Sequence, residues 1–256
     1  FFKYPLEAFD ALGRLGLTQT ALALASYGKA RLRPYPDPRS FEEWVVNRFG
    51  RHLFSIFFKT YSEKLWGVPC TQLDADWAAQ RIKKLSLFEA AKAALFKDRG
   101  QKHKTLLDQF AYPLQGSGVV YERMKAHVEA GGGEVRLSTP VERVLTEGGR
   151  AVGVQLKSGE VLRGDAVVST MPLSLMVRSL PGTPPEVLAA CERLRFRNTI
   201  LVYLEADSPS LFPDNWVYVH SPKVKHGRVT NFRNWSKELH RDRPTSILCM
   251  EFWCFD

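Results

Sequence analysis

The sequence predicts an α+β fold, in which a helical region is followed by a β-meander and then by an antiparallel sheet. Three observations predict it. The first 110 residues carry apolar side chains at helical spacing, the stretch after Tyr112 alternates between turns and short apolar runs, and the chain from Asn198 onward consists of strand-like segments. The 256 residues are 45% apolar and 25% charged, a globular composition that excludes disordered and collagen-like classes.

The helical region begins with a capping signal. Ser40 precedes Glu43 by three residues, so the Ser40 hydroxyl can accept from the Glu43 amide while the Glu43 carboxylate reaches back. Gly50 is a predicted break, and Gly67 a predicted helix end. A second helix is predicted to start near Asp74 or Asp76, with an apolar stripe over 78–95 and a polar loop over 97–104.

The middle of the chain predicts one amphipathic helix and several strands. The helix follows Gly116-Ser117-Gly118 and ends at Gly131-Gly132-Gly133, and Ser158-Gly159 is a predicted hairpin turn. Strands are predicted at 134–137, 141–145, 151–157, 160–163 and, apolar on both faces, 165–170. Two short helices are predicted at 173–180 and 186–194. The last sheet is predicted from strands at 199–205, 216–220, 228–232 and 246–254.

The distribution of charge indicates which binding partners the chain favours, and the cysteine content indicates its cellular compartment. The net charge of +9 is concentrated in two basic blocks, 81–104 and 223–243, with eight and seven Lys or Arg residues against two acidic residues each. Such blocks favour anionic partners, and a solvated surface is the simpler explanation of each. The four cysteines show no zinc-like spacing, so no metal site is predicted, and reduced thiols in a cytoplasmic protein are expected.

No nucleotide-binding or catalytic motif is complete. Gly116-Ser117-Gly118 resembles half of a dinucleotide fingerprint in front of a helix, and a tight turn explains it as well. The region 216–235 interleaves aromatic side chains, such as Trp216, Tyr218 and Trp235, with basic ones. Such rings stack on nucleic-acid bases, line a cavity for a planar or phosphorylated molecule, or pack into the core of a sheet.

Several motifs resemble the flavin amine oxidase superfamily of FAD-dependent oxidoreductases. They are F-E-E-W at 41–44 with R-F-G at 48–50, F-F-K-T-Y-S-E-K-L-W-G at 57–67, A-D-W-A-A-Q-R-I at 75–82 and G-R-V-T-N-F-R-N-W-S at 227–236. Within that superfamily the chain is similar to the protoporphyrinogen oxidase-like and UDP-galactopyranose mutase-like branch, and the resemblance covers nearly the whole chain.

The resemblance implies that the chain is the middle part of such an enzyme and lacks the N-terminal Gly-rich ADP-binding motif. Residues 1–112 would form the helical part of a substrate domain. Residues 113–172 would be a helix and β-meander returning to the FAD-binding domain, and 173–256 the antiparallel part of the substrate domain. FAD is the implied cofactor. Without the Gly-rich motif, we expect this chain alone to bind FAD poorly and to be inactive.

Cofactor contacts follow from the resemblance by position. Val141, in the strand Val141-Glu142-Arg143-Val144, is the predicted backbone contact to the adenine. Thr170, Met171 and Pro172 lie in a loop that is expected to pass near the FAD.

Substrate contacts are predicted on the same basis. Arg228 would pair with a carboxylate or phosphate, Asn231 would form a hydrogen bond, and Trp235 would stack on the substrate or form a wall of its cavity. Tyr61 and Trp66 are further candidates. No catalytic side chain is predicted, because the flavin carries the chemistry.

The predicted function is an FAD-dependent oxidoreductase that acts on a small anionic or amine-containing molecule by hydride or electron transfer to the flavin. A flavin-dependent sugar-nucleotide mutase is one alternative. A non-catalytic basic module that binds nucleic acid or an anionic surface is another. The expected partner is a small-molecule substrate, and no specific binding of nucleic acid is expected. The basic blocks make contact with a membrane surface a further candidate interaction.

Overall fold

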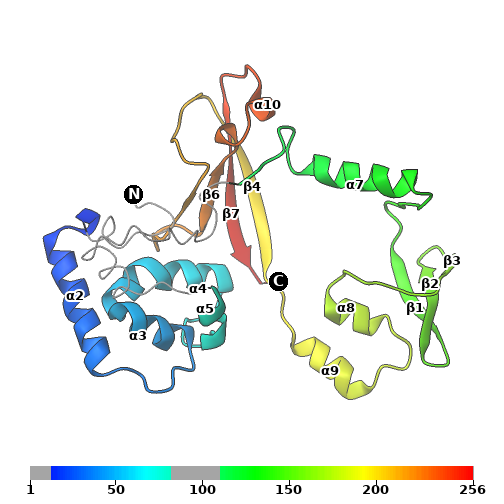
Figure 1. Ribbon diagram of the computed structural model, residues 1–256, viewed down its shortest axis with the longest axis horizontal. Coiled ribbons are helices and arrows are strands. Elements are labelled where there is room, and N and C mark those ends of the chain that lie inside the picture. Colours follow the sequence, from blue (N-terminus) through cyan, green and yellow to red (C-terminus); the bar gives the residue numbers. More distant parts are fainter. Residues whose placement is uncertain (1–12, 82–109, 256) are drawn as a thin grey trace, which may run out of the picture. The chain divides into compact units, whose positions relative to one another are not determined.

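The computed structural model describes residues 13–81 and 110–255, which form an α+β fold with two compact units (Figure 1). The first unit contains the residues up to Gly116 and those from Arg197 onward, and the second contains Ser117–Phe196. The resemblance divides the chain at 113 and 173, whereas the compact units divide it at 117 and 197. The stretch 173–196 therefore groups with the β-meander.

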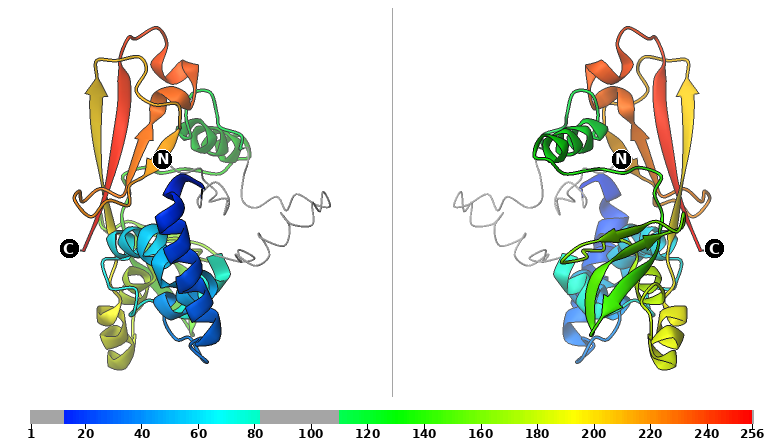
Figure 2. Two further views of the ribbon diagram at one scale, coloured as in Figure 1. Left: turned by 90° about the vertical axis from the view of Figure 1, so that its left-hand side faces the viewer. Right: turned by 90° about the vertical axis from the view of Figure 1, so that its right-hand side faces the viewer.

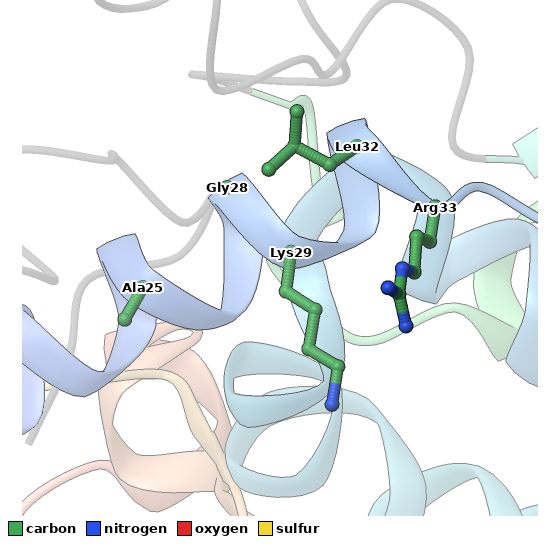
Figure 3. Close-up of a pocket in the computed structure, with 5 residues that line it drawn as sticks. All are labelled: Ala25, Gly28, Lys29, Leu32 and Arg33. Carbon is green, nitrogen blue, oxygen red and sulfur yellow. The ribbon is translucent and has the colours of Figure 1, made fainter.

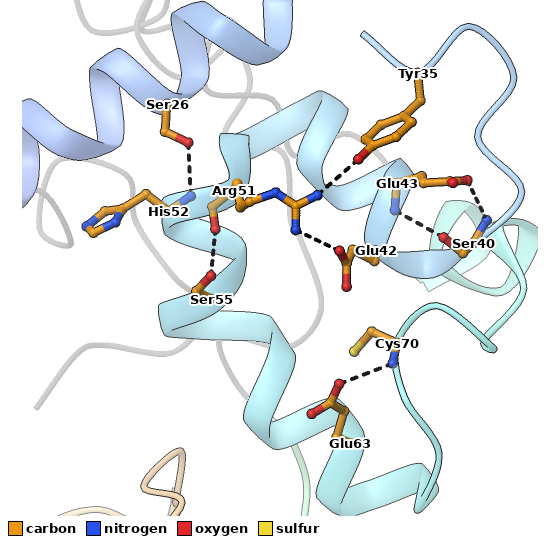
Figure 4. A network of polar contacts seen from close by, with 10 residues as sticks. All are labelled: Ser26, Tyr35, Ser40, Glu42, Glu43, Arg51, His52, Ser55, Glu63 and Cys70. Atoms are coloured by element: carbon orange, nitrogen blue, oxygen red, sulfur yellow. Dashed lines mark hydrogen bonds and ion pairs between the residues drawn. The ribbon is translucent and has the colours of Figure 1, made fainter.

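The first unit opens with a group of helices. They are α2 (Leu17–Leu32), α3 (Phe41–Leu53), the π-helical η1 (Phe54–Lys59), α4 (Thr60–Trp66) and α5 (Ala75–Arg81). The predicted capping box starts α3, since Glu43 N–H donates to Ser40 Oγ at 3.3 Å and Ser40 N–H donates to the Glu43 carboxylate at 3.2 Å (Figure 4). Backbone N–H groups of Arg39 and Ser40 lower the pKa of the Glu43 carboxyl.

Two glycines act as predicted. Gly50 interrupts the regular backbone of α3 with φ +80°, and a side chain there would lie 2.7 Å from the backbone nitrogen of Tyr27 in α2. Gly67 ends α4 in the left-handed conformation with φ +66°. The next helix, α5, starts directly after Asp74, as predicted, and the remainder of its predicted stripe and the 97–104 loop lie outside the described residues.

The helices share one apolar core. Its most buried side chains include Phe41, Val45, Phe54, Cys70 and Ala78. Polar contacts tie the periphery together (Figure 4). Arg51 donates from Nη1 to Glu42 at 2.7 Å and from Nη2 to the Tyr35 hydroxyl at 3.0 Å, and His52 N–H donates to Ser26 Oγ of α2 at 3.0 Å.

A four-stranded antiparallel sheet completes the first unit. Its strands are β4 (Asn198–Ala206), β5 (Trp216–Tyr218), β6 (Arg228–Asn231) and β7 (Ser246–Cys254). They lie in the order β4-β7-β6-β5, so all four strands predicted after Asn198 are present (Figures 1 and 2). The short helices η2 (Phe232–Asn234) and α10 (Lys237–His240) connect β6 to β7.

The second unit contains the helix α7 (Gly118–Ala130), a meander and two short helices. The meander pairs β1 (Val141–Glu147), β2 (Arg150–Leu156) and β3 (Val161–Arg163) in the order β1-β2-β3. The helices α8 (Leu173–Arg178) and α9 (Pro185–Arg193) follow it. Val144 N–H donates to the Ser179 carbonyl at 3.1 Å, which joins the outer edge of β1 to the end of α8.

Two predicted strands are wrong. Residues 134–137 are irregular, and Arg136 forms ion pairs with Glu134 and Glu160 instead of entering the sheet. Residues 165–170 are also irregular, and Val168 is 88% exposed. A strand is stable only when a neighbour accepts and donates its backbone hydrogen bonds, and no strand of the described residues pairs with either segment.

Gly50→Ala is expected to lower the free energy of unfolding by about 2 kcal/mol or more, because the backbone conformation at this position is nearly restricted to glycine and the added methyl group meets the backbone of α2. Urea denaturation followed by tryptophan fluorescence measures the loss. Gly28→Ala in α2 is the matched control. It meets no atom within 4 Å, so it should leave stability unchanged or raise it by about 0.5–1 kcal/mol. Equal effects of the two substitutions would contradict the role of Gly50.

Candidate functional site

The register of the four-stranded sheet gathers aromatic and charged side chains on one face. Tyr218 of β5 lies directly opposite Arg228 of β6, and Arg228 lies directly opposite Glu251 of β7. Directly opposed residues in adjacent strands point to the same side of a sheet, and so do residues two positions apart. Thr199, Glu205 and Ile247 lie toward the ends of this side. We call its remaining residues the aromatic face: Leu201, Tyr203, Trp216, Tyr218, Arg228, Thr230, Cys249, Glu251 and Trp253.

An ion pair lies in the middle of the aromatic face. Arg228 Nε donates to Glu251 Oε1 at 2.6 Å. The Glu251 side chain is only 9% exposed, whereas that of Arg228 is 39% exposed. Burial acts to lower the pKa of Arg228, but the hydrogen bond and the charge of Glu251 raise it above its usual value. The two opposite charges therefore balance each other, and part of the Arg228 side chain stays open to solvent.

The helix α4 places Tyr61 against this face. The Tyr61 ring meets the rings of Tyr218 and Trp253 edge-on at centroid distances of 5.2 and 5.8 Å, and the His220 ring at 5.4 Å. The absence of a side chain at Gly227 allows Trp253 to pack there, since a Cβ atom would overlap the indole ring. Tyr61 and Arg228, predicted from distant parts of the sequence, thus both lie at the aromatic face.

A second group of rings surrounds Trp235. Its closest ring neighbours are Tyr112 at 4.8 Å, Phe110 at 5.4 Å and Trp216 at 5.6 Å. The Trp235 indole N–H donates to the Asn215 carbonyl at 3.2 Å, which leaves its ring as an apolar surface. Because Trp216 belongs to the aromatic face, the predicted Trp235 lies at the margin of that same face.

Asn231 and Trp66 do not join the aromatic face. Asn231 is three positions after Arg228 and points to the other side of the sheet. Its buried amide donates to the Phe212 carbonyl at 3.2 Å and accepts from Arg233 N–H at 3.2 Å. Trp66 packs edge-on against Trp77 in the helical group at 5.1 Å. Both residues support the framework of the first unit in this structure.

Glu251 and Trp253 lie on the aromatic face but were not predicted, whereas Tyr218 is one of the rings of 216–235 for which a cavity lining was one of three interpretations. Glu251 is the only charged residue in the strand S-I-L-C-M-E-F-W-C, and an isolated carboxylate in an apolar strand is a usable signal for a buried ion pair. The sequence does not give its partner, because Arg228 is 23 residues away and the pairing depends on strand register.

A lysine of α4 holds the loop between β5 and β6. Lys64 Nζ donates to the carbonyl oxygens of Ser221, Val219 and His226 at 2.7, 2.9 and 3.2 Å. Burial lowers the pKa of Lys64. Burial and the nearby Lys64 charge lower the pKa of His220, whose Nδ1 is buried without a partner among the described residues.

The predicted cofactor residues lie in the second unit and are open to solvent. Val141 begins β1 at the edge of the meander, and Thr170, Met171 and Pro172 precede α8. All four are exposed. Val141 and Met171 offer exposed apolar surface, and none of the four residues carries a positive charge for a pyrophosphate. The contacts of these four residues with FAD therefore remain predictions.

No cluster of metal-binding side chains occurs within residues 13–81 and 110–255. The four cysteines are free, and burial, with the nearby Glu63 and Glu42 charges, raises the pKa of the Cys70 thiol to about 12. Among the described helices, none combines the length and the apolar composition that crossing a membrane requires.

One basic block overlaps the aromatic face at Arg228, and the two surface hollows are lined by other residues. Block 81–104 falls almost wholly outside the described residues, and block 223–243 includes the exposed Lys223 and Lys225 of the β5–β6 loop. One hollow lies along α2 (Figure 3), and another is lined by residues 150–152 and 163–165 of the meander.

Comparison with known proteins identifies relatives for both sequence and fold. The family described as flavin containing amine oxidoreductase matches residues 2–250. The zeta-carotene-forming phytoene desaturase of Myxococcus xanthus is 29% identical over 125 residues, 48% of this chain and 24% of that protein. The all-trans-zeta-carotene desaturase of the same organism is 42% identical over 83 residues, 30% of this chain and 16% of that protein.

Solved structures share the fold at low sequence identity. Reduced UDP-galactopyranose mutase is similar with a TM-score of 0.77 and 20% identity, over 93% of this chain and 52% of that one. An oxidoreductase from Methanosarcina mazei has a TM-score of 0.64 and 15% identity, over 96% of this chain and 54% of that one. The chain spans about half the length of these proteins, and the segments it shares with the desaturases are shorter.

Arg228→Ala is expected to lower the free energy of unfolding by about 2–4 kcal/mol, because it leaves the Glu251 carboxylate buried without its cation. Urea denaturation measures this loss. The double substitution Arg228→Met with Glu251→Leu should recover most of the stability, since it removes both charges together. A double variant as unstable as Arg228→Ala would show that packing, and not the unpaired carboxylate, causes the loss.

Stability should fall as the pH decreases from 7 to 5. The pKa of His220 is lowered in the folded chain, so below its ordinary value of 6.5 the unfolded chain takes up a proton that the folded chain refuses. His226 shifts in the same direction and adds to the effect. Urea titrations at several pH values measure the slope, and His220→Phe should make it shallower. An unchanged slope in His220→Phe would contradict the assignment.

Proposed function

The chain belongs to the family of flavin containing amine oxidoreductases, and on that premise we propose that the natural polypeptide is an FAD-dependent oxidoreductase in which the aromatic face forms one wall of the substrate site. FAD is the cofactor that the family membership supports. When bound, the flavin accepts a hydride or an electron pair from the substrate, so no nucleophile or acid–base pair is required of this chain. The residues described here bind and orient the substrate and exclude water.

The neutral ion pair on the aromatic face favours an apolar unsaturated substrate over an anionic one. A phosphate or carboxylate binds less tightly to a cation whose charge is already balanced, and the charge of Arg228 is balanced by Glu251 at 2.6 Å. The rings of Tyr61, Tyr218 and Trp253 instead offer apolar contact area. The desaturase names of the relatives from Myxococcus xanthus support a long unsaturated hydrocarbon as the substrate class.

Other residues have supporting roles in this proposal. Tyr203 and Leu201 extend the wall along β4, where their side chains are exposed, and Trp235 closes its margin. Asn231 and Trp66 hold the sheet and the helices in place. Val141, Thr170, Met171 and Pro172 are proposed to contact the flavin nucleotide through backbone groups and apolar surface.

A sugar-nucleotide mutase is the second candidate, supported by the accessible part of Arg228. With 39% of its side chain exposed, Arg228 retains surface on which a diphosphate could bind while Nε stays with Glu251. The similarity to UDP-galactopyranose mutase supports the shared fold. A bound reduced flavin would supply the chemistry of such a mutase without net oxidation, and Arg228 would hold the diphosphate.

The two candidates differ in which compound reacts: the substrate of an oxidoreductase bleaches the oxidised flavin, and the substrate of a mutase is converted by the reduced protein. The natural polypeptide, purified with its flavin, is mixed without oxygen with phytoene in detergent micelles, with a primary amine, or with UDP-galactose. We expect bleaching of the oxidised flavin by the polyene alone. Bleaching by the amine alone would contradict the substrate class. Turnover of the sugar nucleotide by the prereduced protein alone would support the mutase. A purified protein without any flavin would favour the non-catalytic module.

A pair of substitutions on β4 tests whether the aromatic face is the substrate wall. Tyr203→Ser should slow flavin reduction by the polyene about tenfold or more, because an apolar contact is lost. Ile200→Ser is the matched control, since Ile200 is equally open to solvent but points to the opposite face. Flavin content and melting temperature should stay unchanged in both. Equal rates in the two variants would contradict the placement of the wall.

A further inference from the structure

The outward side of α2 is apolar, although it faces solvent. Ala23 and Ala30, seven residues apart, are buried and mark the side that packs on α3. The opposite side carries apolar residues and one glycine at the spacing of a single helical face: Leu17, Ala21, Leu24, Ala25, Gly28 and Leu32. Leu17, Leu24 and Leu32 are 91%, 56% and 85% exposed. A helix that is apolar on both sides needs a cover on its outer side.

Positive charges flank this outer stripe. Lys29 and Arg31 lie on its two sides, and Arg33 follows at the end of the helix. No acidic residue occurs between Gly13 and Pro36. Among the described residues, none of these three cations forms an ion pair. The segment thus joins a continuous apolar stripe to unbalanced positive charge.

Figure 3 shows the C-terminal half of this surface. Ala25, Gly28 and Leu32 line a shallow hollow on the helix together with the long side chains of Lys29 and Arg33. Because Gly28 has no side chain, the hollow opens the helix backbone to a partner that approaches from outside. Long basic side chains beside such a surface can extend their charged ends away from the apolar stripe.

We propose that α2 docks on an anionic lipid bilayer, with its axis in the plane of the interface, its leucine stripe among the upper acyl chains and its cations at the lipid phosphates. This arrangement matches the distribution of side chains on interfacial amphipathic helices, which combine an apolar stripe with Lys and Arg at its borders. Anionic lipids supply the negative charge that the segment lacks. The proposal does not rest on the proposed enzymatic function.

The charges argue against a second copy of the chain as the cover. A symmetric pair places the same patch of both copies face to face, so the cations of both α2 helices would enter one interface. No acidic residue in the segment would balance them. A bilayer surface presents the apolar and the anionic components together and has no such repulsion.

Co-sedimentation with lipid vesicles tests the proposal on the natural polypeptide. Vesicles of equal parts phosphatidylcholine and phosphatidylglycerol should bind the protein, and vesicles of phosphatidylcholine alone should bind it at least about tenfold more weakly. Leu24→Ser with Leu32→Ser should weaken binding to the mixed vesicles about tenfold or more, because two leucines leave the acyl region. Lys29→Gln with Arg31→Gln should weaken it about tenfold or more and reduce its dependence on salt.

Leu175→Ser in α8 is the matched control, since it also removes an exposed leucine from a helix of this chain. It should bind the mixed vesicles as tightly as the unchanged protein, and all variants should keep their melting temperature because the altered side chains are exposed. The proposal is overturned if the unchanged protein binds neither vesicle, or if the α2 variants bind as it does. It is also overturned if the α2 leucine substitutions dissociate a dimer without affecting vesicle binding.

Discussion

The ion pair between Arg228 and Glu251 constrains the sheet on which the candidate site is built. A carboxylate that is almost fully buried is tolerated only when a cation lies within hydrogen-bonding distance. The register of β6 against β7 supplies that cation directly opposite it. A shift of one residue would turn Arg228 to the other side of the sheet and leave Glu251 without a partner. The pair therefore favours one register, and that register also sets Tyr218, Trp216 and Tyr203 on the aromatic face.

Local features of the fold were predictable because they depend on neighbouring residues alone. The capping box at Ser40 and Glu43, the break at Gly50 and the end of α4 at Gly67 each require only a few residues of sequence. The segment 165–170 shows the opposite case. Its composition is typical of a buried strand, but a strand needs a neighbour, and no strand of the described residues provides one.

The candidate site was predictable in part, for a geometrical reason. Arg228 and Asn231 are close in sequence, but strand alternation sets residues three positions apart on opposite sides of a sheet, so the two could not share a face. Tyr61 and Trp66 are five residues apart in a helix and point in different directions. The alternation rule could have separated these pairs in advance. The pairing of Arg228 with Glu251 could not be derived, because it depends on the order of strands that are distant in sequence.

The helix α4 explains how the aromatic face can act as a rigid wall. Tyr61 packs on Tyr218 and Trp253, and one turn later Lys64 holds three carbonyl groups of the β5–β6 loop. At the end of the helix, the Arg197 guanidinium donates to the carbonyls of Lys64 and Leu65 at 2.8 and 3.2 Å. The strand β4 therefore begins beside α4, and both ends of the helix are fixed to the sheet. Contacts of this kind keep rings in position before a substrate arrives, which reduces the ordering that binding must otherwise accomplish.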